Sequence, residues 1–252
     1  MTGSHCLNCN ATVHSRFCPD CGQKSDTHRI VLKHFVMHDL LHGVWHIERG
    51  ILFTIKEALV RPGQAAMDYI SGKRIRYYNV FYLCLLLIGF TVLLSHFYES
   101  FETTHATKSN AQSEHIKNFF KDNLKFIVLS IVPMLAICGY LIFRRLKLNL
   151  AEHFIIAGIA LLGKIFITMV GISINFADRW LPDFMGYVEA VFPFLILLWP
   201  VWVYTNASKG RYRFGGLLWR FIVFYLLFLF LMLVALIAVL FVLTGGEDIN
   251  FK

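Results

Sequence analysis

The sequence predicts an all-α membrane protein, in which a five-helix transmembrane bundle follows amphipathic interfacial helices and a small N-terminal zinc ribbon. Of the 252 residues, 57% are hydrophobic and only 16% are charged, against about 45–50% and about 25% in soluble domains. The apolar residues gather in long runs from Tyr78 onwards, and four cysteines stand in two close pairs near the N-terminus. A soluble fold cannot cover so much apolar surface, so the bilayer is the natural solvent.

The first region, residues 1–25, carries two C-x2-C pairs with eight residues between them in CLNCNATVHSRFCPDCGQ. Each pair suits a tight knuckle, and two facing knuckles give a tetrahedral four-thiolate site that favours zinc, with iron as the alternative. Gly22 permits the backbone turn that a knuckle needs. Stable disulfides do not suit a cytoplasmic location, and a redox motif needs only one pair. A closed site of this kind is structural. The predicted ligands are Cys6, Cys9, Cys18 and Cys21.

The second region, residues 26–77, is predicted to form cytoplasmic juxtamembrane helices. One helix is expected over about 28–46 and another in ILFTIKEALV after Gly50. A break at 61–63 precedes a short helix over 64–71. None is long or apolar enough to span, so we expect them to lie in the headgroup plane or to pack under the bundle.

Histidines recur every four residues in HFVMHDLLHGVWH, at His34, His38, His42 and His46. On a helix, the first and last of these lie about 18 Å apart along the axis, so all four cannot bind one ion. Their arc adjoins an apolar face. We therefore interpret them as the polar edge of a helix at the water–headgroup boundary. Metal binding by an adjacent pair and pH sensing are the alternatives.

The third region, residues 78–252, contains five runs of membrane length. The runs cover residues 78–98, 123–143, 153–175, 187–207 and 217–243. The N-terminal region and the second and fourth loops carry sixteen of the 24 Lys and Arg residues. The positive-inside rule then predicts a cytoplasmic N-terminus and an external C-terminus. No secretory signal peptide is evident at the N-terminus.

A motif stands before the first run, where residues 61–81 read RPGQAAMDYISGKRIRYYNVF. A four-cysteine ribbon that ends in F-C-P-x-C-G-Q, then R-P-G, Y-x-x-G-K-R and an aromatic-rich span, resembles the domain-of-unknown-function 3667 family of bacterial multi-pass membrane proteins. The resemblance covers the ribbon and the chain up to about residue 90. Val80 stands where the family usually has proline. The family name carries no reaction, and the resemblance implies a bacterial inner-membrane location.

The same motif predicts a basic and aromatic collar at the membrane surface. Basic side chains bind headgroup phosphate and aromatic rings anchor at the interface. The sharper hypothesis is a specific anion site for a phospholipid or a phosphorylated lipid carrier, since the planar fork of arginine suits phosphate. The collar residues are Arg61, Lys73, Arg74, Arg76, Tyr69 and Tyr77.

Lys164 lies near the middle of the third run, and an ionisable residue at that depth is a functional hypothesis. Glu189, in the fourth run, is its nearest plausible partner; a snorkelling or structurally paired lysine is the alternative. No catalytic motif accompanies either residue.

The sequence therefore favours a non-enzymatic inner-membrane protein whose zinc ribbon and collar recruit a cytoplasmic protein or organise lipids. A small transporter or channel component is the first alternative, and an enzyme acting on a lipid-linked phosphate is the second. The expected partners are the phospholipid bilayer and a cytoplasmic protein, and a homo-oligomer is compatible with the sequence. The net charge of +8 reflects the topology, so no nucleic acid is expected.

Overall fold

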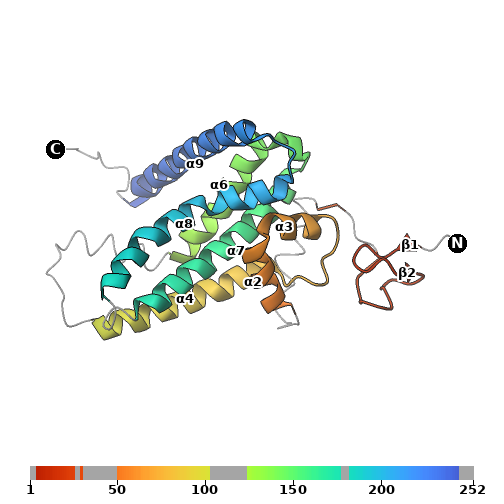
Figure 1. The fold of residues 1–252 in the computed structure, drawn as a ribbon, viewed down its shortest axis with the longest axis horizontal. Helices are drawn as coiled ribbons and strands as arrows, with labels where there is room; N and C mark the ends of the chain where they lie inside the picture. Colours follow the sequence, from red (N-terminus) through yellow and green to blue (C-terminus); the bar gives the residue numbers. More distant parts are fainter. Residues whose placement is uncertain (1–3, 26–28, 31–49, 103–123, 177–181, 244–252) are drawn as a thin grey trace.

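A small two-stranded ribbon precedes a helical bundle (Figure 1). The computed structural model describes residues 4–25, 29–30, 50–102, 124–176 and 182–243. Strands β1 (Ser4–His5) and β2 (Thr12–Val13) pair antiparallel, with Ser4 opposite Val13. The predicted helix over about 28–46, with its four histidines, falls mainly on residues outside the described ones.

Within the described residues, one long helix covers most of each predicted apolar run. These helices are α4 (Val80–Glu102), α6 (Leu124–Ile142), α7 (Leu150–Asn175), α8 (Pro182–Ser208) and α9 (Phe214–Leu243). Four of them, α4, α7, α8 and α9, are long and apolar enough to cross a membrane. The apolar stretch found in α6, Ile127–Ile142, is shorter. The structure therefore supports a membrane protein with four candidate spans, and the count of five stays a prediction.

Helix α7 is the centre of the bundle and packs against α2, α3, α4, α6 and α8. Its glycines admit large rings from its neighbours. A Cβ on Gly163 would lie 2.6 Å from the Trp199 ring of α8, and one on Gly158 would lie 3.0 Å from the Phe81 ring of α4. By contrast, α9 packs chiefly on α6 and exposes most of its apolar side chains. Such a surface suits contact with lipid.

Two short helices, α2 (Ile51–Val60) and α3 (Pro62–Ile70), pack against the end of the bundle nearest the ribbon (Figure 1). The chain breaks at Arg61, and α3 begins two residues earlier than predicted because the fixed φ of Pro62 suits a first helical turn. Gly63 lies against the backbone of α8, and the amide of Gln64 donates to Asn206 Oδ1 at 2.8 Å. Of the two placements expected for these helices, the structure has them packed against the bundle.

Candidate metal centre

The two cysteine knuckles are built alike. In the first, the Asn10 amide donates to the Cys6 carbonyl at 2.9 Å; in the second, the Gly22 amide donates to the Cys18 carbonyl at 2.9 Å. Asn10 and Gly22 occupy equivalent positions, and both have left-handed backbone, with φ of 66° and 74°. The turn predicted at Gly22 is therefore found. Sequence reasoning missed Asn10, although asparagine is the residue that most readily replaces glycine in this conformation.

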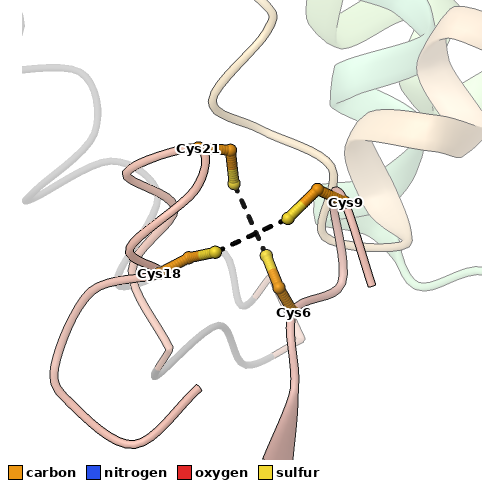
Figure 2. A group of neighbouring side chains, drawn as sticks. All are labelled: Cys6, Cys9, Cys18 and Cys21. Atoms are coloured by element: carbon orange, nitrogen blue, oxygen red, sulfur yellow. Dashed lines mark hydrogen bonds between the residues drawn. The ribbon is translucent and has the colours of Figure 1, made fainter. Parts of the chain in front are cut away.

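The knuckles bring all four cysteine sulfurs together, within 4.8 Å of one another. Figure 2 shows the sulfurs pointing toward a common centre, with Cys6 Sγ 3.6 Å from Cys21 Sγ and Cys9 Sγ 3.5 Å from Cys18 Sγ. Sulfurs that each lie about 2.3 Å from a tetrahedral zinc ion would be about 3.8 Å apart. A disulfide needs about 2.05 Å, and all four cysteines are free. The donor set and its spacing thus fit a metal ion with four sulfur ligands.

The surroundings of Cys21 favour its thiolate form. Partial burial acts to raise the pKa of Cys21, but hydrogen bonds from the Asn8 side chain, the Gln23 backbone and the neighbouring thiols outweigh it. The pKa of Cys21 therefore lies below its ordinary value. Because metals bind thiolates, the second-knuckle backbone and Asn8 prepare this sulfur for a cation.

Both knuckles are bonded to the same turn of the chain, residues 72–76, which precedes α4. From the second knuckle, the buried Gln23 donates through Nε2 to the Gly72 carbonyl at 2.7 Å and accepts from the Ile75 amide at 3.0 Å. From the first knuckle, Asn8 accepts from Arg76, at 2.9 Å to its Oδ1 and 3.2 Å to its carbonyl. These hydrogen bonds attach the four-cysteine cluster to the end of the bundle.

The chain just after the ribbon makes a second attachment. Arg29 forms two hydrogen bonds with the Glu152 carboxylate, at 2.7 and 2.8 Å. Glu152 also completes a capping box with Asn149 at the start of α7, and Asn149 Nδ2 donates to the Ile30 carbonyl at 2.8 Å. Glu152 is buried, so this ion pair ties residues 29–30 to the core of the bundle.

The predicted collar is brought together, but its cations already have partners. Arg61 pairs with Glu57, and Lys73 Nζ lies 2.9 Å from Asp68 Oδ1. The acids were overlooked from the sequence, although Glu57 stands four residues before Arg61, the spacing of a helical ion pair. The guanidinium of Arg74 lies 5.8 Å from the centre of the Tyr69 ring.

Tyr77, also predicted in the collar, is buried, and its ring packs edge-on to that of Tyr69. Among the described residues its phenol has no hydrogen-bond partner. Burial raises the pKa of Tyr77 to about 12. Of the four collar cations, Arg61 and Lys73 are thus paired with acids, while Arg74 stacks on the Tyr69 ring and Arg76 is bonded to Asn8.

Lys164 of α7 lines a cavity of about 230 Å³ between α4, α6 and α7. The remaining lining is aliphatic except for Thr91 and Thr168, whose hydroxyls donate to backbone carbonyls of their own helices. Glu189 belongs to α8, but its side chain lies outside the described ones, so the predicted pairing with Lys164 stays a prediction.

Fold and site define a class: a helical membrane protein whose N-terminal four-cysteine cluster is attached to the end of the bundle. Residues 48–90 match the family model described as a protein of unknown function, DUF3667. The resemblance predicted from the sequence is confirmed over this segment, which contains α2, α3, the 72–76 turn and the start of α4. No curated protein and no solved structure matches the chain.

Proposed function

We propose that this protein is a scaffold of the bacterial inner membrane, with a cytoplasmic N-terminus and an external C-terminus, whose structural zinc ribbon presents a binding face to a cytoplasmic protein. The excess of Lys and Arg in the N-terminal region and the second and fourth loops supports this orientation. Four sulfur ligands in near-tetrahedral spacing fit zinc, the metal proposed here, and they fit the alternative, iron, equally well. Zinc has no redox chemistry, so its role here is to hold the two knuckles in place.

The scaffold proposal rests on how the ribbon is attached to the bundle and on what it leaves exposed. One side is bonded to the 72–76 turn, while apolar side chains on the knuckles remain exposed: 50% of Leu7 and 55% of Phe17. A rigidly held surface loses little conformational entropy when a partner binds. Exposed large apolar groups beside a polar rim are typical of protein interfaces. The expected partner is a protein with a small apolar pocket.

Site-specific photocrosslinking from positions 7 and 17 of the full chain in membranes tests this proposal. We expect one discrete protein adduct from both positions, identified by mass spectrometry. Both adducts should disappear in Cys18→Ser but persist in His14→Ser, which alters another exposed ribbon residue. The adduct from position 7 should also weaken in Phe17→Ser. An adduct of twice the chain mass would identify a second copy as the partner. Adducts that persist in Cys18→Ser, or no discrete adduct, would refute the ribbon face.

A second candidate function is that of a small transporter or channel component, favoured by the cavity beside Lys164. An ammonium group among aliphatic walls suits an amphiphile that carries one carboxylate. A fluorescent long-chain carboxylate should bind the purified protein, and Lys164→Met should weaken binding at least tenfold. Equal binding by both proteins would remove this candidate. The third hypothesis, an enzyme acting on a lipid-linked phosphate at the collar, gains no support because Arg61 and Lys73 are engaged by acids of the chain.

A further inference from the structure

Two loops meet at the end of the bundle that carries the ribbon. The loop between α6 and α7 and the loop between α8 and α9 are joined by two hydrogen bonds. The Arg145 amide donates to the Tyr212 hydroxyl at 3.1 Å, and Arg211 Nη1 donates to the Leu146 carbonyl at 3.0 Å. Arg29, just after the ribbon, donates to the Lys147 carbonyl in the first of these loops. The junction is therefore a fixed part of the fold.

The ring of Tyr212 organises the cations at this junction. Tyr212 is buried, and the guanidinium carbons of Arg145 and Arg220 lie 5.6 and 4.5 Å from its ring centre. Arg220 also lies 4.5 Å from the centre of the Trp219 ring and donates to the Gly216 carbonyl. Stacking on aromatic rings holds a guanidinium in place while leaving other N–H groups free for an anion.

These cations form what we call the loop cluster: Arg144, Arg145, Lys147, Arg211, Arg213 and Arg220. All but Arg220, which is half-buried, are exposed. Among the residues that the structure describes, no carboxylate lies within 4.0 Å of any of them. The ion pairs of the described chain fall elsewhere, at Glu57, Asp68 and Glu152. The cluster thus concentrates positive charge without a counter-charge, in contrast to the collar.

Apolar side chains continue directly from the loop cluster along the start of α9. Phe214 is 84% exposed, Leu218 55% and Trp219 51%. A free phosphate would use only the cations. A phospholipid with an acidic headgroup would use both surfaces, because its phosphate would contact the arginines while its chains cover the rings and Leu218.

We propose that the loop cluster is a binding site for an anionic phospholipid, with the phosphate held by the arginines of the two loops and the acyl chains lying along the start of α9. This site differs from the predicted collar and does not depend on the scaffold role or on the ribbon face. It assigns a ligand of stated chemistry to the junction of the α6–α7 and α8–α9 loops.

The test is a titration of the purified full chain, in neutral detergent, with short-chain phosphatidylglycerol, phosphatidylcholine or inorganic phosphate, read by native mass spectrometry. We expect phosphatidylglycerol to bind at least tenfold more tightly than either of the others. Each cation near a membrane surface contributes a factor of about five. The double variant Arg145→Gln/Arg213→Gln should therefore lose about 25-fold in phosphatidylglycerol affinity.

Lys73→Gln is the matched control, because it removes a cation that Asp68 already pairs, and it should change the affinity less than twofold. The single variants Arg144→Gln and Arg213→Gln, each expected to lose about fivefold, keep the test informative if the double variant aggregates. Equal affinity for both lipids, or an equal loss in Lys73→Gln and the loop variants, would overturn the proposal. If inorganic phosphate bound as tightly as the lipid, the loop cluster would be an anion site in which the acyl chains have no role. This result would also overturn the proposal.

Discussion

Gln23 and Gly72 are 49 residues apart, and the Gln23 side chain donates to the Gly72 carbonyl at 2.7 Å from a buried position. The same side chain accepts from the Ile75 amide. One glutamine beside the metal centre therefore satisfies a donor and an acceptor of the turn that leads into the first membrane-length helix. The ribbon and the 72–76 turn are physically coupled through this contact.

Gln23→Leu should loosen that turn without releasing the metal. Leucine fills a similar volume but leaves the buried Gly72 carbonyl unpaired, at a cost of about 1–3 kcal/mol. It also leaves the part-buried Ile75 amide without its acceptor and open to water. We expect hydrogen exchange at the Ile75 amide to accelerate by about 10- to 100-fold. The control is Ser15→Ala, which removes a hydrogen bond to the Phe17 carbonyl within the ribbon and should leave Ile75 protected. Unchanged protection in Gln23→Leu would contradict the coupling.

Metal removal should also accelerate hydrogen exchange at the Ile75 amide, because it disrupts the ribbon side of the contact. The ribbon is too small to bury a core, so the metal supplies its folding energy. Elemental analysis should find about one zinc per chain. Cys18→Ser should lose it and should expose the Ile75 amide to exchange. Cys84→Ala, which changes a buried cysteine of α4 outside the four-cysteine cluster, should keep the metal. An Ile75 amide that stays protected in metal-free protein would show that the 72–76 turn is stable without the ribbon.

The sequence predicted the elements that short stretches of the chain determine. The knuckles follow from cysteine spacing, and the long helices follow from the length of each apolar run. The start of α3 at Pro62 differs by two residues from the prediction, because proline is a favoured first residue of a helix as well as a breaker.

The contacts that attach the ribbon to the bundle were not predictable in this way. The contacts of Gln23 with Gly72, Asn8 with Arg76, and Arg29 with Glu152 join residues 49, 68 and 123 apart in the chain. No periodicity or spacing encodes such pairs. The charge of the collar depends likewise on pairs that a count of cations omits: Glu57 lies one helical turn before Arg61, and Asp68 lies five residues before Lys73.

Tyr77→Phe should leave the protein as stable at neutral pH or make it more stable, because it removes a buried hydroxyl without a hydrogen-bond partner. Burial raises the pKa of Tyr77 from 10.0 to about 12, so the folded state favours the neutral phenol. The associated stability is present below pH 10 and is lost as the pH rises toward 12. Thermal unfolding between pH 9 and 12 should therefore fall less steeply for Tyr77→Phe than for the wild type. Parallel curves would show that the phenol is hydrated.

Gly63→Ala should be the most damaging small substitution in the R-P-G motif. A Cβ at this position would lie 2.1 Å from the Ala207 amide nitrogen and 2.3 Å from the Val203 carbonyl oxygen. Both are backbone atoms of α8, so no rotamer change relieves the overlap, and α3 must move away from α8. The shift would also break the hydrogen bond from Gln64 to Asn206. Overpacking of this kind costs about 3 kcal/mol or more where the backbone must give way.

Gly89→Ala supplies the matched control for that substitution. Gly89 lies within α4, and a Cβ there would have no atom within 4 Å. Alanine favours helix by about 1 kcal/mol over glycine, so this variant should keep or slightly raise the Tm in detergent, while Gly63→Ala should lower it by several degrees. Equal Tm values for the two variants would mean that α3 does not pack closely on α8. The glycine of the R-P-G motif would then have no packing role against α8.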